Sequence, residues 1–208
     1  MAEPASVGWL GEFRDGQRET EFRNTYLDYT RRFNITGAMI VLAASIVLTL
    51  NDLSSASPGD GVDLVRNGQS FLALLCCFLS WRFHTWQVVY AANYLLTVSV
   101  LVGTVWIDLS RPADYLLHLG MDVVVIFAVY AAVPAAVMRL VLALGFTAGL
   151  LWVHFSIKQP IYEMADVTVP VSLVIANTVG AATASLYNRV RRLLHASEMA
   201  RDPGPQSG

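Results

Sequence analysis

Four polar residues lie within long apolar stretches of the chain, where their side chains could do chemistry. His118 and Asp122 are four residues apart, so on a helix they share one face. His154 and Asn177 lie in the two apolar stretches that follow. Burying an ionisable group among apolar neighbours is costly, which makes such a group a functional candidate. We predict that His118, Asp122, His154 and Asn177 line a ligand pocket.

The pair of His118 and Asp122 also admits other interpretations. An imidazole and a carboxylate at this spacing could form an internal hydrogen bond, relay a proton or share a metal ion. The pattern H-x-x-x-D alone does not indicate a metal, so we predict no metal site, and no cofactor is required. The chain has no G-x-S-x-G, phosphate-binding loop or H-E-x-x-H motif, so no enzymatic activity is predicted from it.

The composition indicates a membrane protein. Of the 208 residues, 55% are hydrophobic and 14% are charged, whereas an ordinary soluble domain carries about 25% charged residues. The mean hydropathy is +0.49. The net charge of -2 and the pI near 6.0 give no attraction to nucleic acid. The two cysteines, Cys76 and Cys77, are adjacent and predict no disulfide.

Six stretches are apolar and long enough to cross a bilayer core of about 30 Å. Because the runs are continuous rather than alternating, they predict helices and not a barrel. The fold class is therefore all-α, a polytopic bundle of six membrane-spanning helices. The stretches are residues 35–53, 67–81, 87–107, 114–133, 134–157 and 166–187.

The basic residues predict how the bundle is oriented. Alternating the six spans places eleven of the 14 basic residues on one side, and leaves Arg66, Arg111 and Lys158 on the other. Cytoplasmic loops are enriched in Lys and Arg, so both termini are predicted to be cytoplasmic. The chain then divides into a cytoplasmic segment (1–34), a membrane domain (35–187) and a cytoplasmic helix with a tail (188–208).

Both flanks of the membrane domain have helical patterns. Phe22, Tyr26, Tyr29 and Phe33 recur at steps of four, three and four, which predicts an amphipathic helix with an aromatic face. This helix could be an interfacial anchor or a moving part that docks on the bundle. The last span continues without Gly or Pro as far as Pro203, so it could transmit motion. The residues of this predicted output helix are Tyr187, Arg189, Arg191 and Arg192.

Small residues recur on the last two spans at four-residue steps. Such faces let helix backbones approach closely in lipid. They could serve packing within one bundle or a homodimer. The residues are Gly145 and Gly149 on the fifth span, and Ala176, Gly180 and Ala184 on the sixth.

Several short motifs occur in an order typical of one family of membrane domains. They are Glu21-Phe22-Arg23-x-x-Tyr26 before the first span, Asp52 at its end, Tyr115 and Gly120 in the fourth span, Asn177-x-x-Gly180 in the sixth, and Tyr187 with Arg191-Arg192 after it. On these motifs residues 12–198 resemble the six-span membrane domains that precede bacterial class III adenylate or guanylate cyclases and diguanylate cyclases. The chain departs from the family at Asn188, where a glutamate is usual, and its 208 residues include no cyclase domain.

The resemblance implies a sensory or receptor module without catalysis of its own. A small-molecule or lipid ligand would bias the bundle, and the last span would pass that state to a cyclase domain, in cis or in trans. A homodimer in the bacterial inner membrane is also implied. The chain could be a stand-alone module or a piece of a longer cyclase. The alternative function is a small proton or cation transporter or channel that uses Asp122 and His118.

Overall fold

The computed structural model describes residues 7–54, 61–110, 117–158 and 165–201. Within these ranges the chain is helical apart from short turns and an N-terminal loop that is closed by a bridge between Val7 and Phe13. The predicted all-α class is confirmed. The helices are α1 (Gly16–Thr25), α2 (Leu27–Ser54), α3 (Val62–Arg82), α4 (Trp86–Ser110), α5 (Leu117–Ala132), α6 (Ala136–Trp152), the π-helical turn η1 (Val153–Lys158) and α7 (Ala165–Arg201).

Five of the described helices are long and apolar enough to cross a membrane, so helix length and hydropathy make this a multi-pass membrane protein. They cover Leu27–Leu50, Val62–Arg82, Trp86–Ser110, Ala136–Ile157 and Val167–Met199. The helix in the predicted fourth span, α5, is shorter than expected. Its 16 residues rise about 24 Å, less than a bilayer core of about 30 Å. Residues 114–116 of that predicted span lie outside the described residues.

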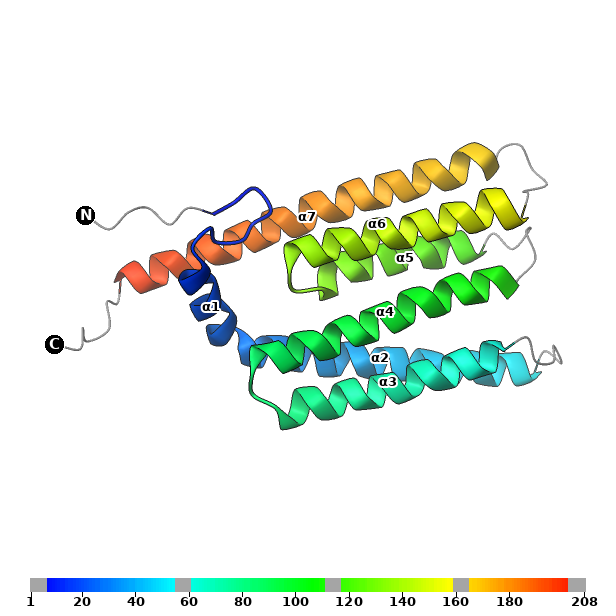
Figure 1. Cartoon of the computed structure of the whole chain (residues 1–208), viewed down its shortest axis with the longest axis horizontal. Helices are drawn as coiled ribbons and strands as arrows, with labels where there is room; N and C mark the ends of the chain where they lie inside the picture. The colour runs from blue at the N-terminus through cyan, green and yellow to red at the C-terminus, as the bar shows by residue number, and fades with distance from the viewer. Residues whose placement is uncertain (1–6, 55–60, 111–116, 159–164, 202–208) are drawn as a thin grey trace.

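The helices form a bundle of two groups (Figure 1). α2, α3 and α4 pack together, α5, α6 and α7 pack together, and α4 contacts both α5 and α6. Tight turns join α3 to α4 and α5 to α6, so these pairs are antiparallel hairpins. The helix α1 and the last turns of α7 lie at the same end of the bundle (Figure 1).

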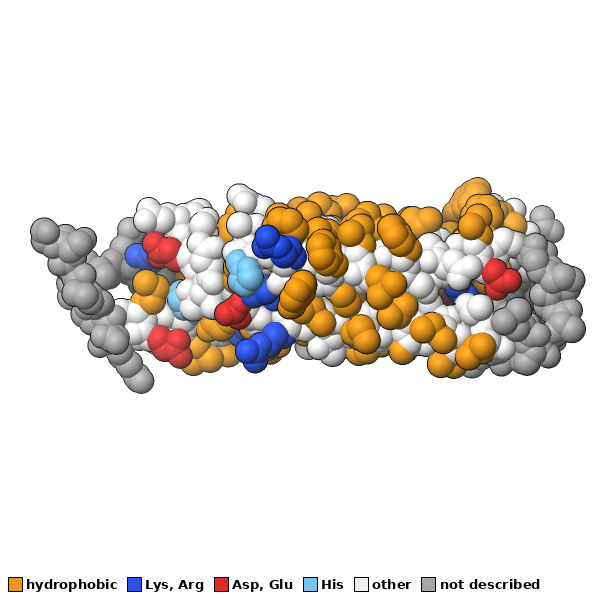
Figure 2. All heavy atoms as spheres, turned by 90° about the horizontal axis from the view of Figure 1, so that it is seen from below, with side chains coloured by type: hydrophobic (Ala, Val, Ile, Leu, Met, Phe, Trp, Pro, Cys, Tyr) orange, Lys and Arg blue, Asp and Glu red, His pale blue; other side chains and the backbone are white. Residues whose placement is uncertain are grey.

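The outer surface of the bundle carries many apolar side chains. Ile40, Phe71, Val102 and Val141 are all more than half exposed. Figure 2 shows hydrophobic side chains over the middle of one face, with most of the charged side chains of that face toward the end that holds α1. Soluble monomers rarely expose so large an apolar surface, which suits contact with lipid chains.

α7 is a single helix of 37 residues that continues past Tyr187 to Arg201. Three small residues on it, Ala176, Gly180 and Ala184, are buried, and a Cβ at Gly180 would lie 2.9 Å from ring atoms of Tyr130 on α5. In this structure the three residues therefore serve packing within the chain. Of the glycines on α6, Gly149 faces Val105 of α4, whereas a Cβ at Gly145 would have no neighbour within 4 Å.

The aromatic residues of the N-terminal flank are divided between two helices. α1 ends at Thr25, and its C-cap Tyr26 has a non-helical backbone (φ -96°, ψ 11°) before α2 begins at Leu27. The prediction of one continuous amphipathic helix is therefore wrong for its four aromatic residues, Phe22, Tyr26, Tyr29 and Phe33. The break turns α1 across the end of the bundle (Figure 1), where the Tyr26 ring packs 5.8 Å from that of His195 on α7.

Candidate functional site

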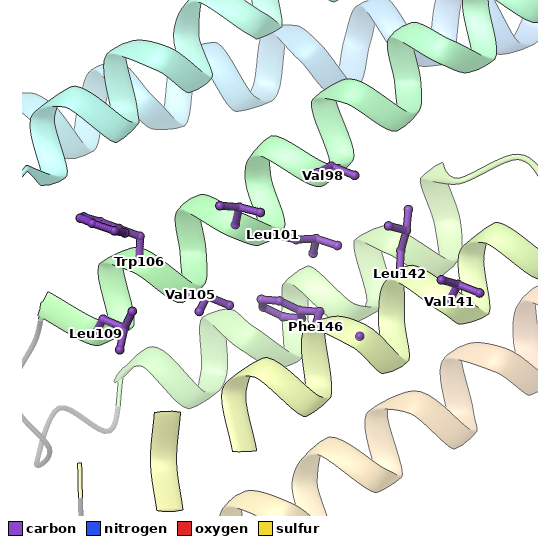
Figure 3. Close-up of a pocket in the computed structure, with 10 residues that line it drawn as sticks. Val98, Leu101, Val105, Trp106, Leu109, Val141, Leu142 and Phe146 are labelled. Atoms are coloured by element: carbon purple, nitrogen blue, oxygen red, sulfur yellow. The ribbon is translucent and has the colours of Figure 1, made fainter. Parts of the chain in front are cut away.

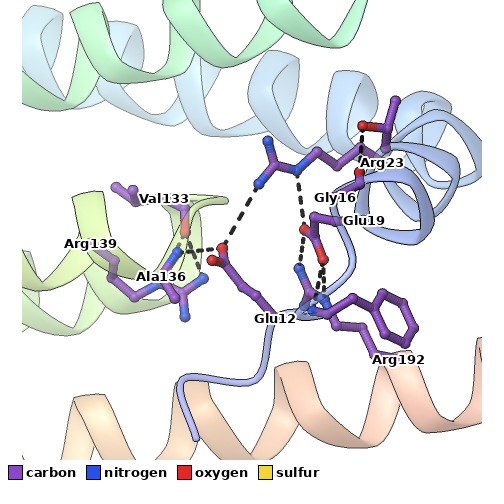
Figure 4. A network of polar contacts seen from close by, with 10 residues as sticks. Glu12, Gly16, Glu19, Arg23, Val133, Ala136, Arg139 and Arg192 are labelled. Atoms are coloured by element: carbon purple, nitrogen blue, oxygen red, sulfur yellow. Dashed lines mark hydrogen bonds and ion pairs between the residues drawn. The ribbon is translucent and has the colours of Figure 1, made fainter. Parts of the chain in front are cut away.

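A buried ion pair joins α1 to α7 at the end of the bundle where arginines gather, which we call the arginine end. Nε of Arg192 donates to Glu19 Oε2 at 2.9 Å, and its Nη2 donates to Oε1 at 2.6 Å. Nε of Arg23 donates to the same carboxylate at 3.1 Å (Figure 4). Glu19 is 7% exposed and Arg192 is 3% exposed. Two-point arginine–carboxylate pairing fixes orientation as well as charge, so α1 is held in one position on α7.

Local sequence explains why Glu19 lies there. Asp15 caps α1 by accepting a hydrogen bond from the Gln17 amide at 2.9 Å. Before the cap, Gly11 has a φ of 82°, and a Cβ at this position would lie 2.9 Å from the Asn188 side chain on α7. The loop therefore needs glycine both for its backbone conformation and for its close approach to α7.

The charges around Glu19 keep it ionised. Burial raises the pKa of this carboxyl, but the hydrogen bonds and the positive charge of Arg192, together with the Phe13 amide and Arg23, lower it more. The pKa of Glu19 therefore lies below its ordinary value of 4.5. A lowered pKa in the folded state stabilises the fold above the ordinary value, and this contribution is lost as the pH falls through the lowered one.

A second set of contacts ties the N-terminal loop to the turn between α5 and α6. Glu12 Oε1 accepts a hydrogen bond from the backbone N–H of Ala136 at 2.9 Å, at the start of α6, where a negative charge is favourable. Arg139 donates from Nε to the Val133 carbonyl at 2.9 Å. With the Asn188 amide oriented so that its oxygen faces Arg139, Nη1 also donates to that oxygen at 2.8 Å. The N-terminal loop, the α5–α6 turn and α7 are thus joined at one place (Figure 4).

Polar contacts also reach the first group of helices. The guanidinium of Arg23 lies 5.0 Å from the Trp86 ring and 5.5 Å from the Tyr90 ring, both on α4. Asn93 on α4 donates to Asn34 Oδ1 at 2.9 Å and to the Ala132 carbonyl at 3.3 Å. The N-terminal segment, residues 7–26, therefore contacts both groups of helices.

The guanidinium of Arg191 lies among aromatic rings. Its Cζ is 4.5 Å from the ring of Tyr26, 4.9 Å from Tyr29, 5.5 Å from Tyr187 and 5.8 Å from Phe22. Such cation–π contacts favour this position of the charge. Among the described residues, none makes a hydrogen bond or ion pair with Arg191.

A cavity of about 540 Å³ opens beside Arg191 between α2, α5 and α7. Arg23, Arg139, Arg191 and Arg192 line its polar part. Phe127, Tyr130, Gly180 and Ala184 line its apolar part, deeper along the bundle. No aspartate or glutamate is among its lining residues in the described part of the chain.

The N-terminal motif drew attention to Glu21, but the buried acidic residue of α1 is Glu19. Glu21 is exposed, with a contact of 3.4 Å from Gln17 Nε2. Phe22, Arg23 and Tyr26 do lie at the arginine end, in contact with α7 or α4. Of the predicted output residues, Arg191 and Arg192 face this site, whereas Tyr187 is partly at its edge and Arg189 is exposed. In the sequence, Glu19 could have been identified because it stands one helical turn before Arg23, a spacing at which the two side chains can pair.

The predicted ligand pocket is only partly described. The side chain of His118 lies outside the described residues, and the carboxyl of Asp122 lies near that of Asp108 on α4. Both carboxyls are buried. His154 lies on η1, with its ring 4.9 Å from that of Phe155.

Asn177 belongs to a different polar cluster from Asp122. Its Oδ1 accepts from the Tyr130 hydroxyl at 3.1 Å, and its Nδ2 donates to Thr147 Oγ1 at 2.7 Å. Tyr130 follows Asp122 by eight residues, which places it about 12 Å farther along α5. The cluster therefore joins α5, α6 and α7 in the core, and Asn177 is not beside Asp122.

A second hollow of about 330 Å³ lies between α4 and α6 (Figure 3). Its lining is apolar and includes Val98, Trp106, Val141, Gly145 and Phe146. The close-up shows Val105 of α4 and Phe146 of α6 pointing toward one another, and among the labelled side chains only Trp106 carries a polar atom. With this lining, the hollow has no charged or catalytic side chain and is not a candidate site.

Three or more metal-ligating side chains do not come together anywhere in the described ranges. Comparison of the chain with protein-family models, with curated proteins and with solved structures gave no match. A function must therefore be argued from the geometry of the arginine end.

Proposed function

We propose that the chain is a signal-input module of the membrane, a six-span bundle that reports its state through α7. In this proposal α5 is the fourth of the six spans. An even number of spans places the N-terminal segment and the end of α7 on one side, and they do lie at one end of the bundle (Figure 1). The arginines at that end support a cytoplasmic location for it.

The observation that carries this proposal is the contact of the N-terminal segment with the last part of α7, from Leu186 to Arg201, which we call the extension of α7. At 37 residues, α7 is about 55 Å long, roughly 25 Å more than a bilayer core. Glu19 holds this extension through Arg192, while Arg23 and Glu12 reach α4 and α6. A shift of one helix group against the other would therefore change the contacts that fix the position of α7. A ligand that favours one arrangement of the two groups could bias that position.

The extension of α7 also offers a surface for a homodimer. Leu186, Val190 and Leu193 are exposed and follow one another at steps of four and three residues. Apolar residues at this spacing form the seam of a coiled coil. The stripe of Ala176, Gly180 and Ala184 is already used against α5, so a dimer would form through the extension, next to a cytoplasmic output domain such as a cyclase.

A chimaera tests this function. We expect that fusing a cyclase catalytic domain after the full chain, and then changing Glu19→Gln, alters cyclic-nucleotide output about fivefold or more, the scale of a coupling free energy of 1 kcal/mol or above. The matched change Glu21→Gln on the same helix should leave output at the level of the unmodified chimaera. Equal output from all three chimaeras, at equal membrane levels, would contradict a signalling role for this site.

One observation favours the alternative of a proton or cation transporter or channel. The carboxyls of Asp122 and Asp108 are neighbours buried within the bundle, and such a pair can hold and release a proton. Under this alternative, proteoliposomes containing the chain should show proton flux that Asp122→Asn abolishes. Equal proton flux in liposomes with and without the protein would exclude this alternative.

A further inference from the structure

We propose that the cavity beside Arg191 binds one anionic phospholipid, with its phosphate on the guanidinium of Arg191 and its acyl chains toward Gly180 and Phe127. The proposal identifies a ligand class for the arginine end. It rests on the proposed function only in treating the lipid as a signal, since binding itself requires no signalling role.

The charge of the cavity calls for an anion. Four arginines line it, and in the described part of the chain the carboxylates that contact them are those of Glu12 and Glu19. Two positive charges therefore remain in excess within a partly buried space. An anionic ligand would balance these charges, and a zwitterionic one would not.

Arg191 is the arginine whose donors are available. Arg139 and Arg192 donate to carbonyl or carboxylate oxygens, and Arg23 donates to Glu19. The Arg191 guanidinium is instead positioned by rings, which leaves its N–H groups without acceptors among the described residues. A planar guanidinium held in place by aromatic faces is well suited to two-point binding of a phosphate.

The walls of the cavity match an amphiphile rather than a small soluble anion. Its arginines lie at the end of the bundle that holds α1, while Phe127, Gly180 and Ala184 lie farther into the apolar part of the bundle. Tyr29, Phe33 and Tyr187 are partly exposed at its edge, as aromatic residues at a membrane interface often are. A volume of about 540 Å³ accommodates a headgroup and the first part of the chains.

Native mass spectrometry of the full chain tests this proposal. The protein would be purified in detergent and exposed to equal amounts of phosphatidylglycerol and phosphatidylcholine. We expect one retained phosphatidylglycerol per chain and about tenfold weaker retention for Arg191→Gln, as loss of one charge-assisted contact predicts. Arg189→Gln, which removes an exposed arginine two residues away outside the cavity, should retain the lipid as the unmodified chain does.

A second pair of variants keeps all the arginines. Thr183→Phe places a ring in the cavity and should displace the lipid, whereas Ala182→Phe adds the same ring at an exposed neighbouring position outside the cavity and should not. Both positions are exposed, so neither change disturbs the buried core. Retention that is equal for Arg191→Gln and Arg189→Gln, and for Thr183→Phe and Ala182→Phe, would overturn the proposal.

The source of the phosphate is tested separately. Millimolar inorganic phosphate should not displace the bound phosphatidylglycerol, because it lacks the chains that fill the apolar part. Displacement by inorganic phosphate alone, or equal retention of phosphatidylcholine, would overturn the assignment to an anionic lipid. Lipid retention with an unresponsive cyclase chimaera would refute the signalling function while leaving the binding site intact.

Discussion

Replacing Glu19 with alanine is expected to lower the free energy of unfolding by about 3 kcal/mol, because it leaves a buried arginine without its carboxylate. Arg192, 3% exposed, would lose both of its bonds to Glu19, and Arg23 and the Phe13 amide would each lose an acceptor. Denaturant titration of the purified protein measures the change. Tryptic cleavage after the exposed Arg14 and Arg18 should also become faster, because the N-terminal segment would open locally.

The neighbouring variant Glu21→Ala is the matched control. Glu21 is exposed on the same helix, so its loss should change the free energy of unfolding by no more than about 0.5 kcal/mol. The pH gives a second readout. Since folding lowers the pKa of Glu19, the contribution of this ion pair is complete above pH 4.5 and is lost as the pH falls through the lowered value. Glu19→Gln should remove this part of the acid sensitivity. Similar stabilities for Glu19→Ala and Glu21→Ala would show that the ion pair does not hold α1.

Hydropathy alone was enough to predict the helical class and the membrane setting. Continuous apolar runs predict membrane-spanning helices whatever their neighbours are. The length of α5 and the break at Tyr26 were not predictable in this way. The break depends on Tyr26 meeting His195 and Arg191, which are far away in the sequence.

The site shows a similar division. Phe22, Arg23 and Arg192 were selected from their place in the flanks, and the structure brings them together. The carboxylate that joins them is that of Glu19, which stands four residues before Arg23, whereas Glu21 of the motif is exposed. Asp122 and Asn177 were grouped because both are polar within apolar runs. Which polar groups meet depends on the register between helices, and this register gives Asp122 the partner Asp108 and gives Asn177 the partner Tyr130.

Adding one methyl group to Gly180 should separate α7 from α5. A Cβ at this position would lie 2.9 Å from Cγ and Cε2 of Tyr130, and closer still to Cδ2. Tyr130 is 4% exposed and its hydroxyl is bonded to Asn177, so the ring cannot turn away without losing that bond. Overpacking of this kind costs about 1–3 kcal/mol. We therefore expect Gly180→Ala to lower the free energy of unfolding by about that amount, measured by denaturant titration. In the cyclase chimaera, the same substitution should lower the cyclic-nucleotide output.

Gly145→Ala is the control for the same chemical change on the neighbouring helix. A Cβ there would meet no atom within 4 Å, so only the helix propensity of alanine acts, and this favours the fold by up to about 1 kcal/mol. The two substitutions should thus change stability in opposite directions. If Gly180→Ala were as stable as Gly145→Ala, then α5 and α7 would not pack through this glycine. A shift of α7 relative to α5 would then cost little, and the position of its extension would depend chiefly on the pair of Glu19 and Arg192.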